Sequence, residues 1–225
     1  MKTKPDTPAI SGVWLVAIVI LILVLDQALK FWVKTNMLYH EIIPILGLDW
    51  ARLHFVENEG MAFGKRFNIP HGKLILSLFR LVAAGFLVYY LRTLLRTPKV
   101  RRGLLISFAL ILAGAVGNII DSAFYGLIFT ESFTHGLPAT LVPIGEGYGT
   151  FLHGKVVDMF SFPLFSTTTP NWWPFGAGRP FTFFGAIFNL ADVAISWGVI
   201  QIMLFHRDFF QQSPTQAEEQ REEEE

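Results

Sequence analysis

The sequence contains no cysteine. Disulfide bonds, thiolate chemistry and metal sites built on Cys are therefore excluded, and the chain cannot itself be a lipoprotein acylated on Cys. Charge is also scarce, because charged residues make up 16% of the chain against roughly 25% in ordinary soluble domains. The formal net charge is zero, and no basic patch indicates a nucleic-acid partner. Hydrophobic residues reach 52%, which predicts a membrane protein.

Four apolar stretches are long enough, or nearly so, to cross a bilayer, which needs about 20 residues of helix. They cover residues 13–33, 74–91, 103–121 and 184–205. The first follows Lys2 and Lys4, but no small-residue cleavage site comes after it and its helical pattern continues through "DQALKFWV". We therefore expect a membrane span there rather than a cleaved signal peptide. The predicted fold class is an all-α membrane protein with four transmembrane helices.

The loop "RTLLRTPKVRR" between the second and third spans is rich in Lys and Arg and has no acid. Short basic loops stay in the cytoplasm, so four spans place both termini there too. The segments at about 35–72 and 122–183 then lie outside. The first contains "LHFVENEGMAFG", whose alternating apolar residues and Gly predict a small β-rich segment, a short hairpin. The second is a long extracytoplasmic loop, of a length that is either functional or disordered.

We predict a single four-helix membrane domain over residues 1–212. Residues 213–225 follow as a cytoplasmic tail with six Glu and one Arg. Such a block of like charge is solvated and disordered.

Polar residues recur at one depth of the predicted helices. The third span ends "GNIID" and the fourth contains "FNLAD", and each motif puts an Asn and an Asp three residues apart on one helix face. These residues are Asn118, Asp121, Asn189 and Asp192. The first span adds Asp26 and Lys30, four apart on one face, and the second adds Arg80. In the predicted orientation, all four spans carry their ionisable groups in the outer half of the membrane.

Such groups are either structural or functional. Hydrogen bonds between membrane helices are worth about 0.6–2 kcal/mol, which makes a structural role reasonable. Acids collected at one depth are instead candidates for a functional site. A further acid, Asp158, lies in the apolar run "KVVDMFSFP", although one acid in a surface strand is common. Two carboxyl groups in one site share a proton, as in aspartic proteolysis. The matching Asn-x-x-Asp motifs favour Asp121 as the partner of Asp192, and Asp158 is the alternative.

Five segments, in order along the chain, together resemble lipoprotein signal peptidase, the signal peptidase II family. They are "LDQALK", "VENEGMAFG", "GAVGNIID", "VVDMF" and "FNLADVAI". The resemblance implies a multi-pass aspartic endopeptidase of the bacterial inner membrane, with its active site toward the periplasm. It implies removal of the signal peptide from prolipoproteins by cutting before a diacylglyceryl-modified Cys, with no metal or other cofactor. The expected partners are that substrate and membrane lipid, without nucleic acid, and we expect a monomer.

The resemblance also implies roles for single residues. It makes Asp158 and Asp192 the catalytic pair, rather than Asp121 and Asp192. The residues expected to hold the substrate backbone are Asn58, Gly60, Asn118 and Asn189. The residues expected to support the site are Asp26, Lys30 and Asp121.

Two features depart from the family pattern. The family usually has Arg directly after the "GNxxD" block, where this chain has Ser122. We hypothesise that Arg80, at similar depth, supplies the missing cation. The second feature is the segment "STTTPNWWPFGAGRPFTF" between Asp158 and Asp192, which either caps the site or is a surface elaboration.

Other classes of function compete with this interpretation. An intramembrane-acid transporter or proton-coupled carrier also collects acids in a membrane, but its sites lie near the midplane. A serine–lysine protease using Lys30 with Ser77 or Ser196 lacks a motif that positions the Ser. The six His residues show no metal-ligand spacing such as H-x-x-x-H. A structural or assembly protein would need no cluster of acids.

Overall fold

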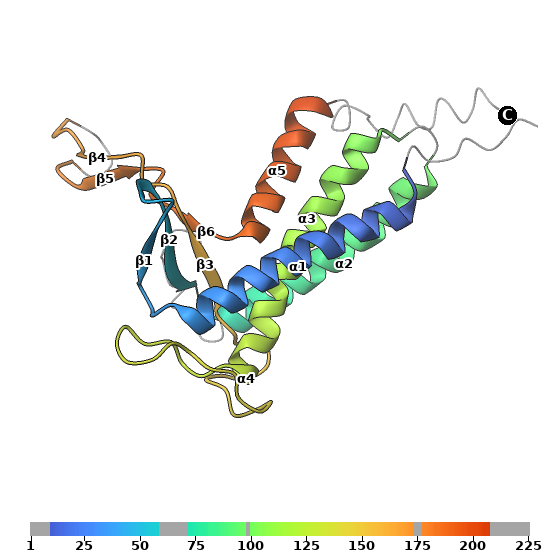
Figure 1. The fold of residues 1–225 in the computed structure, drawn as a ribbon. Helices are drawn as coiled ribbons and strands as arrows, with labels where there is room; N and C mark the ends of the chain where they lie inside the picture. The colour runs from blue at the N-terminus through green and yellow to red at the C-terminus, as the bar shows by residue number, and fades with distance from the viewer. Residues whose placement is uncertain (1–9, 59–71, 98–99, 173–176, 208–225) are drawn as a thin grey trace, which may run out of the picture.

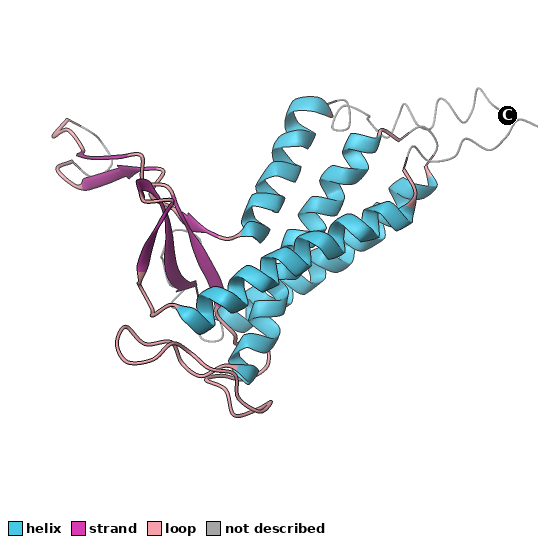
Figure 2. Cartoon of the chain, in the orientation of Figure 1, coloured by secondary structure: helices cyan, strands magenta, loops and turns pink. Residues whose placement is uncertain are grey.

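The computed structural model describes residues 10–58, 72–97, 100–172 and 177–207 of the chain. The long helices run side by side, and the strands gather beyond one end of them (Figure 1). Figure 2 shows this division into a helical part and a strand part.

Three long helices form the body of the protein. They are α1 (Gly12–Asn36), α2 (Gly72–Arg96) and α3 (Arg102–Ile120). Each is long and apolar enough to cross a membrane, which confirms the first three predicted spans in place and type. A helix suits such sequences because it bonds its backbone groups within the segment, and lipid offers them no other partner.

Helix α3 is the centre of the bundle. It packs against α1, α2 and the last helix. In its most apolar 18-residue stretch 56% is buried, compared with 11% in the corresponding stretch of α1. It also continues further than predicted, through a π-helical turn (Asp121–Tyr125) and α4 (Gly126–Ile128). The predicted end at residue 121 was therefore too early, because the apolar run "AFYGLI" carries the helix onward.

Helix α5 (Leu190–Phe205) has 16 residues and is the shorter apolar helix of the bundle. The predicted start at residue 184 was wrong by six residues. Asn189 caps the helix, and the residues just before it pair in a sheet instead. α5 lies very close to α3, because a Cβ on Gly114 would meet the backbone oxygen of Ala191 at 2.2 Å.

The main sheet has four antiparallel strands in the order β1-β2-β3-β6. Their bounds are β1 (Ile42–Ile45), β2 (Leu48–Asn58), β3 (Val156–Ser161) and β6 (Ile187–Phe188). The turn between β1 and β2 places Leu46 and Gly47 at positive φ, which suits a two-residue hairpin. This is not the predicted hairpin, whose turn was expected in the Gly-rich end of "LHFVENEGMAFG". The first part of that motif forms the end of β2 at Asn58, and the expected turn, including Gly60, lies outside the described residues. The β structure is larger than the sequence predicted.

A second, two-stranded sheet projects from the main one. It consists of β4 (Phe165–Thr168) and β5 (Pro180–Phe183), paired in antiparallel. The region predicted as one long loop, 122–183, therefore contains a helical extension and three strands. Figure 1 shows the β4–β5 hairpin reaching away from the helices.

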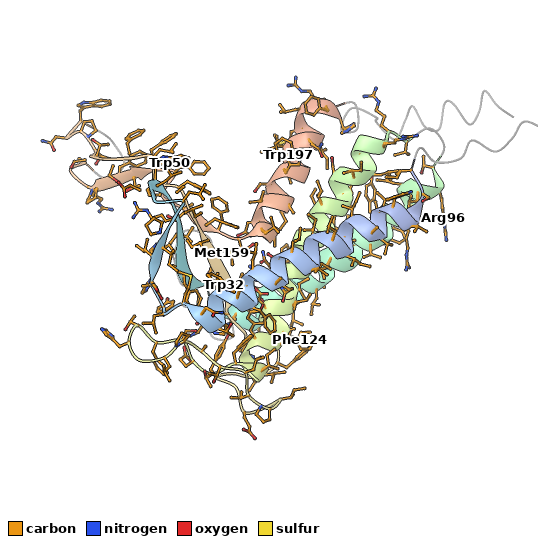
Figure 3. All side chains as sticks on the ribbon, in the orientation of Figure 1. Trp32, Trp50, Arg96, Phe124, Met159 and Trp197 are labelled. Atoms are coloured by element: carbon orange, nitrogen blue, oxygen red, sulfur yellow. The ribbon has the colours of Figure 1, made fainter. Side chains whose placement is uncertain are left out.

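An apolar cluster joins the sheet to the helices. It includes Val33 and Met37 of α1, Phe55 of β2, and Val157 and Met159 of β3, all fully buried. Figure 3 shows Met159 between the strands and the helices, while Arg96 lies at the opposite end of the bundle. The sheet is therefore fixed to the end of the bundle that lies away from the basic loop.

Candidate active site

Asp158 lies in the middle of β3, where four consecutive residues are buried. Its side chain is 5% exposed. The amide Nδ2 of Asn189 donates a hydrogen bond to Asp158 Oδ1 at 2.7 Å. The side chain of Asn58, which lies in β2 opposite Val156, also forms a hydrogen bond with Asp158. Two asparagines from separate elements thus hold this carboxyl group.

The surroundings of Asp158 favour its neutral form. Burial above all, and then the negative charge of Asp192, raise the pKa of Asp158 to about 7. The hydrogen bonds from Asn189 and Asn58 and the charge of Lys30 act in the opposite direction. Desolvation and a like charge are the two causes that separate the pKa values of a carboxyl pair. The Asp158 carboxyl group therefore keeps its proton to a much higher pH than an ordinary aspartate does.

Asp192 belongs to the first turn of α5, where it forms a capping box with Asn189. The Asn189 side chain accepts a bond from the backbone N–H of Asp192, and the Asp192 carboxylate accepts one from the backbone N–H of Asn189 at 3.2 Å. This motif satisfies two donors at the start of a helix. It also places the Asp192 side chain at the positive end of the helix dipole.

Asn118 connects the two acids to the rest of the bundle. Its Nδ2 donates to Asp192 Oδ1 at 3.0 Å. Its Oδ1 accepts bonds from Asn189 Nδ2 at 3.2 Å and from Lys30 Nζ at 2.9 Å. The structure thus brings together Asn118 and Asn189, which the sequence predicted on two separate helices.

Lys30 is fully buried and meets three acceptors. Its ammonium group lies 2.9 Å from a carboxylate oxygen of Asp26, 2.9 Å from one of Asp121, and 2.9 Å from Asn118 Oδ1. Three acceptors match the three donors of an ammonium group. A buried lysine this well partnered serves to hold the surrounding helices in register.

Besides their ion pairs with Lys30, Asp26 and Asp121 each accept a hydrogen bond from a backbone N–H group of another element. Asp26 Oδ1 accepts from the N–H of Ala191 in α5 at 2.9 Å. Asp121 Oδ2 accepts from the N–H of Val157 in β3, at 3.2 Å, one residue before Asp158. These contacts connect α1 and α3 to the two elements that carry the candidate catalytic acids.

Arg80 reaches the same region from α2. Its Nη1 donates to Ser122 Oγ at 3.2 Å, and the carboxylates that act electrostatically on its guanidinium are Asp192, Asp121 and Asp158. Arg80 therefore lies beside Ser122 and near these acids.

Two groups of residues at this end of the bundle were missed by the sequence analysis. Gln27 donates to Asp121 Oδ1 at 2.9 Å and accepts from the Tyr125 hydroxyl at 3.1 Å. Lys34 is fully buried and pairs with Glu57 of β2. The spacing of Lys34, four residues after Lys30 and on the same helix face, was the signal that could have found it.

The Lys34–Glu57 pair is part of a larger cluster. Lys34 also bonds to Ser132 Oγ at 2.9 Å and faces the ring of Tyr148 at 5.0 Å. Lys155 lies 3.7 Å from Glu57 and pairs with Glu131. This cluster ties the segment after α4 to β2, directly beside Asn58.

The arrangement as a whole suits acid–base chemistry on a peptide bond. Asp158, with its raised pKa, lies near a second carboxyl group, that of Asp192, and asparagine side chains surround them. Within the described residues, no group of three or more His, Asp or Glu side chains is arranged to hold a metal ion. A bundle of membrane helices with this carboxyl pair defines the class of membrane-embedded aspartic peptidases.

The chain belongs to the signal peptidase (SPase) II family, which it matches over residues 18–207. It is 47% identical over 197 residues to the lipoprotein signal peptidase of Porphyromonas gingivalis, a match that covers 86% of this chain and 83% of that protein. It is 37% identical to the lipoprotein signal peptidase of Amoebophilus asiaticus, covering 87% of this chain and 78% of that protein. It is 32% identical to that of Chlorobium phaeobacteroides, covering 84% and 93%.

Solved structures share the fold at lower identity. A bacterial membrane enzyme determined by the in meso method at 2.3 Å resolution superposes with a TM-score of 0.59 and 18% identity, covering 94% of this chain and 98% of that chain. A second bacterial membrane enzyme, at 1.9 Å, gives a TM-score of 0.57 and 19% identity, covering 90% and 96%.

Proposed function

We propose that this protein removes the signal peptide from prolipoproteins as an intramembrane aspartic endopeptidase, cutting before a diacylglyceryl-modified Cys. The family assignment and the relatives named lipoprotein signal peptidase support the activity. The observation that carries the proposal is the carboxyl pair, in which Asp158 has a pKa of about 7 beside the charge of Asp192.

In the proposed reaction, Asp192 acts first as the base. Its carboxylate takes a proton from a water molecule, and the resulting hydroxide attacks the scissile carbonyl carbon. The Asp158 carboxyl group donates a hydrogen bond to the carbonyl oxygen and then gives its proton to the leaving amine as the C–N bond breaks. The proton that Asp192 took from water passes to Asp158, which restores the starting pair.

Asp121 is assigned a supporting role. Both of its oxygens are engaged, one with Lys30 and Val157 N–H and the other with Gln27. A carboxylate held in this way is not free to exchange protons with a substrate. The contacts of Asp158 favour it over Asp121 as the partner of Asp192.

The remaining polar residues are assigned by what they contact. Asn58, Asn118 and Asn189 surround the carboxyl pair, and we propose that their amides hold the substrate backbone, together with Gly60. Asp26 and Lys30 support the site through their buried ion pair, and Arg80 supplies positive charge beside it.

The membrane placement follows from the two ends of the bundle. We propose that α5 is a fourth crossing and that residues 1–212 are one membrane domain. The basic loop marks the cytoplasmic end, since short loops rich in Lys and Arg are retained there. The beginning of α1 lies beside the end of α2, and the beginning of α3 beside His206, so these ends share one side. The site then faces the periplasm from the bacterial inner membrane, in a monomer surrounded by lipid.

The test is cleavage of a diacylglyceryl-modified prolipoprotein by the purified protein in lipid vesicles, with the product masses giving the bond cut. Asp192→Asn should abolish cleavage. Asp49→Asn, at an exposed acid of β2, is the matched control and should cleave normally. Cleavage by Asp192→Asn at the wild-type rate would refute the assignment.

The same vesicles separate a peptidase from a carrier. Family membership gives no support to a carrier. A proton-coupled carrier would acidify the vesicle interior or accumulate a solute without cutting the substrate. Solute uptake without cleavage would overturn the proposal.

The orientation of the protein in the membrane has a separate test. Because the sequence has no cysteine, a single introduced Cys is the only thiol that can be labelled. Asp49→Cys and Thr97→Cys would be treated with a membrane-impermeant maleimide in intact spheroplasts. We expect labelling at residue 49 and protection at residue 97 until the membrane is permeabilised. The reverse pattern would place the site in the cytoplasm.

A further inference from the structure

The β4–β5 hairpin has two chemically different faces. Residues directly opposite on antiparallel strands share a face, and so do residues two apart on one strand. One face therefore carries Phe165, Thr167, Phe181 and Phe183, and the other carries Ser166, Thr168, Pro180 and Thr182. We call the first the aromatic face and the second the hydroxyl face of the hairpin.

The aromatic face is ordered but uncovered by the described residues. Phe165 and Phe183 stack with ring centroids 5.1 Å apart. All eight strand residues are exposed, and Phe165 retains 54% of its surface. The hydroxyl face is polar, with Ser166 and Thr182 hydrogen-bonded at 3.0 Å.

A hairpin in this state needs a surface to rest on. An isolated two-stranded hairpin is at best marginally stable in water. Large exposed apolar patches mark surfaces that meet a membrane or a protein. The stacked rings are therefore best explained by an apolar phase that covers the aromatic face.

The composition of the hairpin favours lipid as that phase. From residue 164 to residue 185, the chain has one charged residue, Arg179, and no acid. Aromatic rings suit the membrane–water interface, and an exposed Trp172 lies beyond β4. A lone cation next to such rings is attracted to anionic headgroups.

The position of the hairpin points to the same occupant. β5 ends at Phe183, seven residues before α5 begins at Leu190. The ring of Phe184 contacts that of Phe188 edge-on, with centroids 6.4 Å apart, and Phe188 contacts Phe162 at 5.8 Å. Packed rings thus lie between the end of the hairpin and the start of α5.

We propose that the β4–β5 hairpin lies in the outer membrane–water interface, with its aromatic face in the lipid and its hydroxyl face toward water. The inference rests on the membrane placement proposed above, and it does not rest on the cleavage activity. The hairpin would hold β3 and β6, which flank it in sequence, at a fixed depth in the bilayer.

The test uses two neighbouring threonines of β4. Thr167→Cys and Thr168→Cys would carry a nitroxide label in vesicles of phosphatidylethanolamine and phosphatidylglycerol, and its collisions with oxygen and with a water-soluble nickel chelate would be measured. Val82→Cys, on the exposed side of α2, gives the lipid reference, and Thr97→Cys gives the water reference. We expect a several-fold higher oxygen-to-nickel ratio at residue 167 than at residue 168.

The other outcomes overturn the proposal. High nickel access at both positions would mean that the hairpin projects into water. Protection from both reagents at residue 167 would mean that protein covers the aromatic face. A higher ratio at residue 168 would mean that the opposite face meets lipid.

A charge placed on each face gives a second test. Phe181→Asp should make the label at residue 167 accessible to nickel, whereas Thr182→Asp should not. Cleavage by the unlabelled protein is measured separately, so failure of the proposed activity would leave these results unchanged.

Discussion

The guanidinium of Arg80 on α2 donates a hydrogen bond to Ser122 Oγ, 42 residues away in the chain, at 3.2 Å. Ser122 Oγ in turn donates to the backbone oxygen of Asn118 at 2.9 Å. We propose that Arg80 supplies, from a neighbouring helix, the cation that the family pattern has directly after the "GNxxD" block. Charge near a site depends on position in space, so such a relocation would keep a positive charge beside the acids.

If Arg80 supplies the cation beside the acids, an arginine at position 122 should be able to replace it. Arg80→Ala should lower kcat/KM by roughly 10- to 100-fold, because a hydrogen bond to a charged group is worth about 1.5–3 kcal/mol. The double variant Arg80→Ser with Ser122→Arg should recover part of the loss seen in Arg80→Ser alone. Cleavage assays at equal protein level measure both. Arg92→Ala, near the end of α2 that is distant from the acids, is the control, and full activity of Arg80→Ala would sink the hypothesis.

The two candidate partners of Asp192 should respond differently to neutralisation. Asp158→Asn should abolish cleavage, because it removes the proton that the leaving amine needs. Asp121→Asn should retain more activity and lose stability instead, by about 3–5 kcal/mol, since it leaves Lys30 with one carboxylate fewer in a buried site. Cleavage rates per folded protein and unfolding midpoints give the comparison. The reverse ranking of activities would make Asp121 the catalytic residue.

The pH dependence should report Asp158. If its protonated form is required, kcat/KM should fall as the pH rises through about 7, the pKa of that carboxyl. The hydrogen bond from Asn58 stabilises the carboxylate and lowers the pKa, so Asn58→Ala should raise it and move the alkaline limb to higher pH. Asn171→Ala, at an exposed asparagine in the β4–β5 connection, should leave the profile in place. A shift to lower pH in Asn58→Ala would contradict the assignment.

The Asp158 carboxyl group should make the protein less stable as the pH rises, whereas an acid whose pKa is lowered on folding makes it more stable. Its pKa is raised on folding, so the folded state keeps a proton that the unfolded state loses above about pH 4. Stability should therefore decline from about pH 4 to pH 7, and Asp158→Asn should flatten that slope. Thermal unfolding of the protein in vesicles between these pH values measures the effect. An unchanged slope would mean that Asp158 is not the titrating group.

Replacing only one member of the buried Lys34–Glu57 ion pair should lower the free energy of unfolding more than replacing both. Lys34→Met leaves a buried carboxylate and should cost about 3–5 kcal/mol, whereas Lys34→Met with Glu57→Met should cost less, because both charges leave together. Glu131→Gln, at a more exposed member of the cluster, should cost under about 1 kcal/mol. Denaturant unfolding measures each. Additive losses in the double variant would show that the two residues do not interact.

The spans were readable from the sequence because lipid imposes a simple requirement on every helix. The start of α5 was harder. Residues 184–189 are as apolar as a helix in a bilayer, but pairing of Phe188 with Phe160 and capping by Asn189 end the helical stretch there. Both effects depend on contacts outside the segment, which hydropathy does not report.

The site was predicted unevenly for a similar reason. Helix periodicity found Asn118 with Asp121 and Asn189 with Asp192, because each pair lies on one element. Asp158 lies on a strand, and its approach to α5 follows from tertiary packing, so the family resemblance was needed to select it. The sequence placed Arg80 at a depth similar to that of Ser122, but the bond that joins them depends on how α2 packs on α3.

The short length of α5 has a mechanical consequence. Its 16 residues span about 24 Å at 1.5 Å per residue, less than the roughly 30 Å of a bilayer core. If α5 is the fourth crossing proposed above, it would begin inside the bilayer, where Asp26, Asn189 and Asp192 satisfy its first N–H groups. Hydrophobic mismatch of this kind is relieved by local thinning of the bilayer. A depression in the outer leaflet beside Asp192 would let a lipid-anchored substrate reach the acids without leaving its own leaflet, so vesicles of longer acyl chains should slow cleavage.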